Sequence, residues 1–399
     1  MNRVFVEIEV QRTQAYLSRS LSLRGRRGAS ALLLDLHRHL ADLAPGPGGT
    51  TWRREDSAPA IDGKLVLVAD PAGDELDDAG VEAEVRRLTA ALRRRLPAVE
   101  LHAQWYRGRD HLADRPDPDD PTVGHLVSLP PRPEWPLARP CDRCGIDPAI
   151  VEVPRPEPGR VCRDCKARED AGGDSSPHEK DLAETFRELG HEVAIVRDLS
   201  QLAGAGPTET VRRNGSGGTA RRSLKRNHLA TVFIDANQLG ATVRRLAAET
   251  PETERGAAVA AFSRAVADAV ATALEHAAIV VHDQAGTPDV ATTVPHVKGG
   301  DDVLVTVPAA LWVPFTLTYL DRFHGHLAEQ GHALTASAAV VVAHHKHPFH
   351  HVVDVADELL TRTKARLGGT SAGIGWVDLT DERPDTHEPV SLDWVHEHE

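Results

Sequence analysis

The chain has 399 residues, of which 41% are hydrophobic and only 4% are aromatic. Because domains commonly hold about 100–200 residues, this length predicts two to three domains, with cores built mainly from Ala, Val and Leu. The 46 basic and 59 acidic residues give a formal net charge of −13. This charge argues against a broad electrostatic grip on nucleic acid, although a bound metal or a few cations can still hold phosphates locally.

The sequence predicts a cytoplasmic protein without a membrane partner. No uncharged apolar stretch approaches the roughly 18–20 residues that span a bilayer. The start of the chain, MNRVFVEIEVQRTQ, is already amphipathic and lacks the pattern of a signal peptide.

Residues 1–110 predict a first domain in which strands and helices alternate. Val4, Val6, Ile8 and Val10 occupy every second position, which is typical of one face of a strand. The further elements expected here are a helix over 11–20, a helix over 31–43 after the basic stretch 24–30, a strand over 64–69, a helix over 81–96 and a strand over 101–106.

Residues 111–228 predict a linker and a small cysteine module with helices. Residues 110–140 are rich in Pro and Asp, as linkers are, and a helix is expected over 179–189. Residues 205–227 are rich in Gly, Ser and Arg. Two interpretations of this basic run stay open: a solvated connection, or a contact with nucleic acid.

The four cysteines form two C-x-x-C pairs, Cys141 with Cys144 and Cys162 with Cys165, separated by 17 residues. Each pair lets two thiolates converge on one ion, and two pairs complete the tetrahedral sulfur site that Zn²⁺ prefers. Such a closed site has no open position, so we expect structural rather than catalytic zinc. Disulfides are the alternative, which a cytoplasmic setting disfavours.

Residues 229–399 predict a second domain that repeats the plan of the first. The expected elements are a strand over 229–234 ending at Asp235, helices over 238–248 and 256–276, a hairpin of 294–297 with 303–307, a helix from 314, a strand over 337–342, a helix over 348–366 and a strand over 372–377. This order is βαββαβ, the ferredoxin-like plan. The sequence therefore predicts an α+β protein with two such domains around the Cys₄ zinc module.

Three carboxylates are expected to lie together in the second domain. In a βαββαβ sheet the first and third strands are central neighbours, so Asp235 at the end of one should meet Asp301 and Asp302 at the start of the other. Three clustered carboxylates suit two hard cations, Mg²⁺ or Mn²⁺, which can activate a hydroxyl and stabilise the leaving oxygens of a nucleoside triphosphate. Gly299-Gly300-Asp301-Asp302 alone also fits a plain hairpin turn, and the Asp235 strand end favours the metal site.

These segments resemble the palm domain of the large, polymerase-like subunit of type III CRISPR effectors. The resemblance rests on the GGDD motif at 299–302, IDANQLG at 234–240, SAAVVVAHHKHP at 337–348 and DELLTRTK at 357–364. The segments QAYLSRS at 14–20 and RGASALL at 27–33 resemble the first palm of the same proteins. The cysteine module lies between the two palms, as it does in that family.

The resemblance implies a nucleotide cyclase of antiviral defence. Its two palms bind two molecules of ATP, or of another NTP, and the palm with the GGDD motif joins them through 3′–5′ linkages into cyclic oligoadenylate, releasing pyrophosphate. The implied catalytic and metal-binding residues are Asp235, Asp301 and Asp302. The implied nucleotide-binding residues are Gly299, Gly300, Ala236, Asn237, Lys364, Gly28, Ala29 and Ser30.

Two parts of that family are not expected here: a histidine–aspartate nuclease domain before the first palm and a long helical domain after the second. We therefore expect no DNA cleavage and an enzyme that acts alone or with different partners. The candidate partners are defence-complex proteins, an RNA trigger and a second copy of the chain. Two other functions stay open, namely a catalytically silent scaffold or nucleotide sensor, and a cyclase that makes a cyclic mono- or dinucleotide.

Three smaller features have alternative interpretations. The histidines over 344–351 fit an exposed strand end and helix start, a substrate contact or a second metal site. Lys298 fits a phosphate-steering role or a solvated turn. For Asn237 we favour capping of the following helix over catalysis.

Overall fold

A computed structural model describes residues 3–20, 22–34, 36–46, 49–56, 58, 63–70, 76–112, 114–117, 120–130, 138–154, 158–212, 219–223, 227–380 and 389–398. The chain divides into two compact units, here called unit 1 (Met1–Gly173 and Val243–Arg264) and unit 2 (Asp174–Thr242 and Ala265–Glu399). The three-part division at 110 and 228 stays a prediction.

Unit 1 is built on a five-stranded antiparallel sheet in the order β2-β3-β1-β4-β5. Its strands are β1 (Arg3–Gln11), β2 (Trp52–Arg54), β3 (Lys64–Ala69), β4 (Glu100–Gly108) and β5 (Gly124–Ser128). Strand β1 is central, and its residues from Val4 to Ile8 are buried. Strand β5 lies within the segment that the Pro- and Asp-rich composition predicted to be a linker, because it pairs with the edge of β4.

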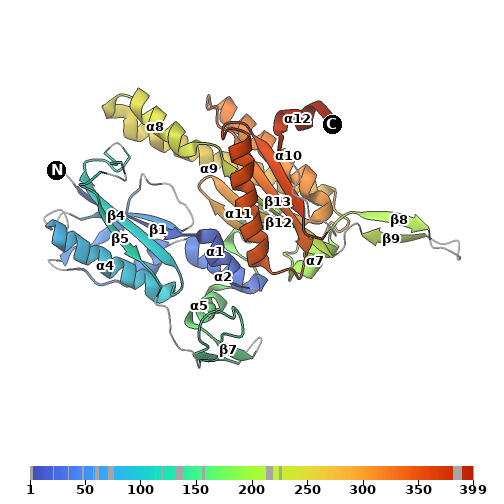
Figure 1. Cartoon of the computed structure of the whole chain (residues 1–399), viewed down its shortest axis with the longest axis horizontal. Helices are drawn as coiled ribbons and strands as arrows, with labels where there is room; N and C mark the ends of the chain where they lie inside the picture. The colour runs from blue at the N-terminus through green and yellow to red at the C-terminus, as the bar shows by residue number, and fades with distance from the viewer. Residues whose placement is uncertain are drawn as a thin grey trace. The chain divides into compact units, whose positions relative to one another are not determined.

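The helices of unit 1 correct one sequence expectation. They are α1 (Thr13–Ser18), α2 (Leu23–Leu34), the 3₁₀ helix η1 (Leu36–Leu40) and α4 (Asp78–Arg95), which lies along β4 and β5 (Figure 1). The helix expected over 31–43 begins at Leu23 instead, so the basic stretch lies inside α2. Arg26 and Arg27 are buried there, which a reading of their charge alone did not anticipate.

The cysteine module belongs to unit 1 and comprises β6 (Val151–Val153), β7 (Gly159–Val161) and α5 (Arg163–Ala171). Helix α5 packs closely on α2. A Cβ atom on Gly28 would lie 1.9 Å from the carbonyl oxygen of Arg168, so only glycine permits this approach. The buried Arg168 guanidinium donates to Asp164 at 2.8 Å and to the Tyr16 carbonyl at 2.7 Å, and its carbon lies 4.0 Å from the Tyr16 ring centroid.

Unit 2 is built on a six-stranded sheet in the order β11-β12-β10-β13-β14-β15. Its strands are β10 (His228–Ala236), β11 (Val294–Gly299), β12 (Asp302–Pro308), β13 (Ala336–His344), β14 (Gly373–Asp378) and β15 (Val390–Ser391). Strand β10 pairs antiparallel with β12 and β13, and the parallel pair β13–β14 is joined through a helix. Strands β10 and β12, the first and third strands of this sheet along the chain with β11 between them in sequence, are therefore central neighbours, as predicted.

The helices of unit 2 include α6 (Pro177–Glu188), α7 (Leu199–Gly204), the 3₁₀ helix η3 (Ala309–Leu311), α10 (Trp312–Glu329), α11 (Phe349–Arg366) and α12 (Leu392–His398). Helices α8 (Leu239–Glu249) and α9 (Glu252–Asp283) join β10 to β11. Helix α11 contacts β13, β10 and β14 and lies along this part of the sheet (Figure 1). The basic run over 205–227 contains a hairpin of β8 (Thr208–Arg212) and β9 (Thr219–Ser223), and its contact with nucleic acid stays a prediction.

The sequence contains no uncharged apolar stretch of membrane-spanning length, but helix α9 meets a looser criterion. When a window of 18 residues is allowed up to two charged residues, α9 is long and apolar enough to cross a membrane. Half of that window is buried within the protein, and core helices of globular proteins pass the same test. The burial of α9 therefore favours a core helix.

Gly28→Ala is expected to destabilise the chain, because the new methyl group would collide with the backbone of Arg168. Overpacking of this kind costs about 1–3 kcal/mol, so the midpoint of thermal unfolding should fall. Gly325→Ala in α10 is the matched control, since nothing lies within 4 Å of its added Cβ and Ala favours a helix interior by about 1 kcal/mol. Equal midpoints for the two variants would contradict the close packing of α2 on α5.

Candidate functional site

The sheet of unit 2 brings the three predicted carboxylates to one edge. The ladder between β10 and β12 ends with Ile234 opposite Val303. Asp235 directly follows Ile234 and Asp302 directly precedes Val303, so both lie just beyond the same end of this ladder. Gly299 pairs with Asp302 across the β11–β12 hairpin, which leaves Gly300 and Asp301 as a two-residue turn. Gly300 has φ 53°, the left-handed conformation that such a turn requires at its first position.

The carboxylates perturb one another strongly. The pKa of Asp301 is raised from its ordinary value of 3.8 to about 8, first by burial and then by the charges of Asp235 and Asp302. A hydrogen bond between the Asp301 and Asp235 side chains contributes in the same direction. Like charges in a poorly solvated place favour the protonated form, so without a cation this cluster retains a proton at neutral pH.

Tyr319 on α10 belongs to the same site, and the sequence analysis missed it. Its hydroxyl is fully buried and has no hydrogen-bond partner among the residues that the structure describes. Burial and the charges of Asp301 and Asp302 raise the pKa of this phenol. The only signal in the sequence was an aromatic stripe with Phe315 and Phe323 at helical spacing, which is typical of a core helix and says nothing of the hydroxyl.

Lys364, in the last turn of α11, closes the site from another side. Its Nζ atom donates to Asp235 Oδ2 at 2.6 Å and to the carbonyl oxygen of Ala236 at 2.7 Å. The side chains of Lys364 and Asp235 are 22% and 34% exposed, so the pair remains open to a ligand. The structure therefore places Lys364 at the carboxylates, while its predicted contact with a triphosphate stays a prediction.

The donor set fits a hard divalent cation in its chemistry. The three carboxylates carry more negative charge than one retained proton and the Lys364 ammonium group offset. Mg²⁺ or Mn²⁺, bound through the carboxylate oxygens, would neutralise the remainder. The carboxylate oxygens converge less closely than the cysteine sulfurs: among the residues that the structure describes, only the four cysteines form a group of three or more donors that all lie within 4.8 Å of one another. A cation at Asp235, Asp301 and Asp302 would therefore require the carboxylates to turn toward one another and the proton to leave.

Asn237 does not cap a helix, which corrects our preferred interpretation. Its Nδ2 atom donates to Thr335 Oγ1 at 2.9 Å and to the Ser371 carbonyl at 3.1 Å, and its Oδ1 accepts from Ser337 at 3.0 Å. The next residue, Gln238, has φ 56°, a conformation that a non-glycine residue rarely adopts. Asn237 thus ties the end of β10 to the loops beside β13 and β14, and holds in place the backbone that carries Asp235.

The candidate nucleotide-binding residues of the first palm-like segment lie in the core of unit 1. Gly28, Ala29 and Ser30 are buried inside α2, with Gly28 against the backbone of Arg168. Their contact with a nucleotide stays a prediction, as does that of Gly299, Gly300 and Ala236.

The four cysteines converge as the two C-x-x-C pairs predicted. All four sulfur atoms lie within 4.8 Å of one another, and Cys141, Cys162 and Cys165 are buried. Backbone N–H groups of Arg143 and Cys162 donate to Cys141 Sγ at 3.4 and 3.3 Å, and the N–H of Cys165 donates to Cys162 Sγ at 3.3 Å. Such bonds stabilise thiolates, so the cluster fits a tetrahedral zinc ion.

Part of the chain matches a known protein family. Residues 228–370 match the family model for Cas10/Cmr2, second palm domain, a range that includes Asp235, Asp301, Asp302 and Lys364. The chain resembles Cas10. This is the family that the GGDD motif and the segments around it had indicated.

Solved structures of Csm1, the Cas10 of type III-A complexes, are similar to the chain at low identity. The apo Csm1–Csm4 cassette and the cassette in complex with cA4 are each 12% identical, with TM-scores of 0.49, and the matches cover 100% and 99% of this chain and 57% of each Csm1 chain. Csm1 of T. onnurineus is 12% identical with a TM-score of 0.48, and the match covers 99% of this chain and 56% of that one. The chain thus spans little more than half the length of these Csm1 chains. No curated protein matches it.

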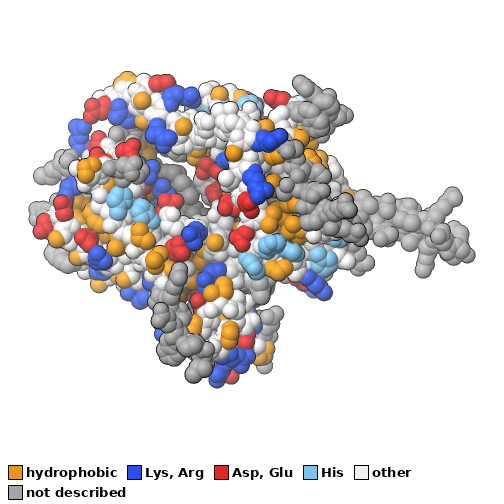
Figure 2. Space-filling view, in the orientation of Figure 1, with side chains coloured by type: hydrophobic (Ala, Val, Ile, Leu, Met, Phe, Trp, Pro, Cys, Tyr) orange, Lys and Arg blue, Asp and Glu red, His pale blue; other side chains and the backbone are white. Residues whose placement is uncertain are grey.

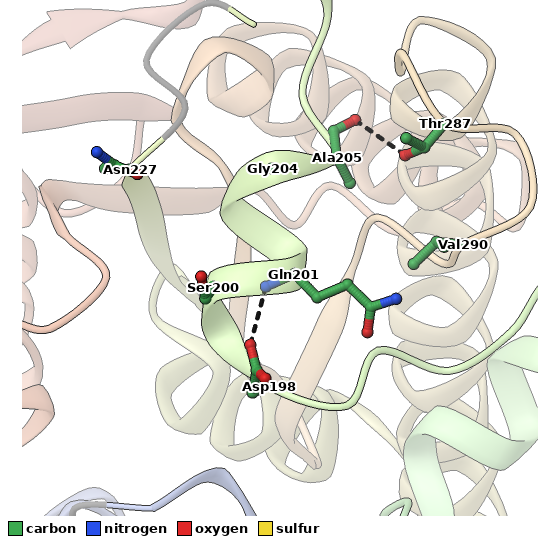
Figure 3. Close-up of a pocket in the computed structure, with 8 residues that line it drawn as sticks. All are labelled: Asp198, Ser200, Gln201, Gly204, Ala205, Asn227, Thr287 and Val290. Atoms are coloured by element: carbon green, nitrogen blue, oxygen red, sulfur yellow. Dashed lines mark hydrogen bonds between the residues drawn. The ribbon is translucent and has the colours of Figure 1, made fainter.

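A cavity of about 580 Å³ lies in unit 2, away from the carboxylates (Figure 3). Its lining includes Asp198, Gln201 and Asn227, and Asn227 directly precedes β10, whereas Asp235 stands near the other end of that strand. In Figure 3, Gln201 extends from α7 toward the side of Thr287 and Val290. Asp198 accepts a hydrogen bond from Gln201 N at 2.9 Å and caps α7, so this carboxylate has a structural task.

Cys165→Ser is expected to release one zinc ion per chain, because three thiolates hold zinc less tightly than four. Zinc content by elemental analysis, set against protein concentration, measures this directly. Cys162 and Cys165 also begin α5, so thermal stability should fall with the loss of zinc. Wild-type protein that carries no zinc after purification without chelators would contradict the assignment.

Proposed function

We propose that the chain is a metal-dependent nucleotidyltransferase that joins nucleoside triphosphates, ATP first among them, into cyclic oligonucleotides as messengers of type III CRISPR-like defence. One observation carries the proposal: Asp235, Asp301 and Asp302 meet at the edge of two paired central strands, with Lys364 2.6 Å from Asp235. The match of this segment to the Cas10/Cmr2 second palm supports the reaction class.

The proposed reaction is a phosphoryl transfer that needs no protein nucleophile. The ribose 3′-oxygen of one nucleotide forms a bond to the α-phosphorus of another, the α–β phosphoanhydride bond breaks, and pyrophosphate leaves. The 3′-hydroxyl loses its proton to solvent or to a carboxylate of the site. Closure of the ring repeats the same exchange at the end of the growing chain, so each linkage releases one pyrophosphate.

The chain's own residues would supply positioning and charge. Asp235, Asp301 and Asp302 would hold the Mg²⁺ or Mn²⁺ ions, which when bound polarise phosphoryl oxygens and lower the pKa of a hydroxyl. Lys364 would turn from Asp235 to the triphosphate as a point charge. Gly299, Gly300, Ala236 and Asn237 would shape the backbone around the first nucleotide, and Gly28, Ala29 and Ser30 would lie near a second one.

The remaining parts of the proposal concern the scaffold and its surroundings. Both sheets begin with the strand order of a ferredoxin-like βαββαβ domain, β2-β3-β1-β4 in unit 1 and β11-β12-β10-β13 in unit 2. We take the zinc ion as structural, the cytoplasm as the location of the protein, and defence-complex proteins and an RNA trigger as its partners.

The Csm1–Csm4 cassettes have been solved in complex with cA4, cA3 and pppApA, so these are the first products to look for.

A catalytically silent nucleotide sensor is the second candidate. The contact of Lys364 with both Asp235 and the Ala236 carbonyl favours it, because an ammonium group that stays there occupies the place of a metal ion. Such a sensor would bind ATP without releasing pyrophosphate.

The test is to incubate purified chain with each NTP and with mixtures, in Mg²⁺ or Mn²⁺, and to resolve products by mass spectrometry. We expect a cyclic or linear oligonucleotide and one pyrophosphate per linkage. Asp301→Ala and Asp302→Ala should lower the rate by at least about 100-fold, since both remove metal ligands. Asp321→Asn, an exposed carboxylate on α10 that bonds His396 at 2.9 Å, is the matched control and should keep full activity.

The outcomes separate the candidates. Tight ATP binding without pyrophosphate would favour the sensor, and a single cyclic mono- or dinucleotide would narrow the product class. Intact NTP under all conditions, including added candidate RNA triggers and partner proteins, would contradict the transferase.

A further inference from the structure

The histidines after β13 lie at the end of the unit 2 sheet that is remote from the carboxylates. Strand β10 pairs with β13 from His228 opposite His344 to Ala236 opposite Ala336, so His344 and Asp235 stand at opposite ends of this strand pair. From His228 to Asp235 the strand rises by about 23 Å, at roughly 3.3 Å per residue. Histidine side chains gather over the lower end of α11 in Figure 2. At this distance the histidines over 344–351 do not contact a substrate bound at the carboxylates.

We propose that His347 and His351 form a binding site for a divalent transition-metal ion. His347 Nε2 and His351 Nδ1 lie 2.9 Å apart, and their ring centroids are 5.2 Å apart. With metal–nitrogen bonds of about 2.0–2.1 Å, this separation corresponds to an angle of about 90° at the metal. That is the edge of a square-planar or octahedral site, whereas a tetrahedral ion would need about 3.3 Å. The spacing therefore favours Ni²⁺ or Cu²⁺ over Zn²⁺.

The backbone holds the two rings in this arrangement. The N–H of His347 donates to the His344 carbonyl at 2.7 Å and closes a tight turn, Pro348 follows, and the N–H of His351 donates to the Pro348 carbonyl at 3.1 Å. The pair thus spans the turn after β13 and the first turn of α11. His347 is half-buried and His351 is exposed, so an ion can enter and water can complete its coordination.

Binding needs no change of oxidation state and no net loss of a proton. In the metal-free pair one neutral imidazole donates its N–H hydrogen to the nitrogen of the other. When the ion binds, this hydrogen moves to the second nitrogen of the same ring, and both facing nitrogens present lone pairs to the metal.

The probe is Ni²⁺, titrated by calorimetry into tag-free, zinc-loaded chain in an excess of Mg²⁺, which occupies the carboxylates. We expect one Ni²⁺ per chain, and a loss of affinity of about tenfold or more in His347→Gln and in His351→Gln. His350→Gln is the matched control, because it removes an exposed imidazole from the same helix turn and should leave the affinity unchanged. Thermal unfolding without Ni²⁺ verifies that the three variants fold equally well.

Three results would overturn the proposal: no uptake of Ni²⁺ by the wild-type chain, the same affinity in all variants, or an equal loss in His350→Gln. The site is independent of the proposed catalysis. Ni²⁺ binding should therefore persist in Asp301→Asn, and its failure would leave the carboxylate site untouched.

Discussion

The feature on which this structure depends is the meeting of three carboxylates at the ends of two hydrogen-bonded strands. The β10–β12 ladder and the two-residue turn at Gly300 hold the backbones of Asp235, Asp301 and Asp302 at neighbouring strand ends. Burial first, and then the charges of Asp235 and Asp302, raise the pKa of Asp301. Holding like charges close together raises the electrostatic free energy of the folded chain unless a cation offsets it. This cost is the physical reason for assigning a metal-dependent function to Asp235, Asp301 and Asp302.

The groups around the carboxylates can be understood from this cost. Lys364 reaches Asp235 from the end of α11 and supplies one positive charge in the absence of a metal ion. Asn237 fixes the backbone after Asp235 through bonds to Thr335, Ser337 and Ser371. Tyr319 presents a buried hydroxyl without a partner among the described residues, next to the carboxylates. Lys364 thus compensates charge at the carboxylates, Asn237 fixes the backbone beside them, and Tyr319 supplies a further polar group.

The central sheet of unit 2 and the Cys₄ cluster were predictable from the sequence, because short apolar runs and C-x-x-C spacing are local signals. The start of α2 was not predictable, since Arg26 and Arg27 have the composition of an exposed loop but are buried in a helix that packs on α5. Tyr319 and the partners of Asn237 were also beyond the sequence, because their roles arise from residues about 20 to 130 positions away. The short strand β5 has no apolar alternation that distinguishes it from a linker.

The most direct measurement of the central claim is the pH dependence of stability without and with Mg²⁺. The pKa of Asp301 is raised to about 8, so the folded, Mg²⁺-free chain holds a proton that the unfolded chain releases above about pH 4. The contribution of Asp301 to the free energy of unfolding therefore falls as the pH rises from about 4 to about 8, and the comparison with Asp301→Asn isolates it.

Asp301→Asn cannot ionise, so it should lose this part of the slope and be the more stable protein near pH 8. Mg²⁺ should stabilise the wild-type chain there and leave Asp301→Asn much less affected, with zinc retained in both. Identical pH profiles for the two proteins, and no effect of Mg²⁺ on either, would contradict the account.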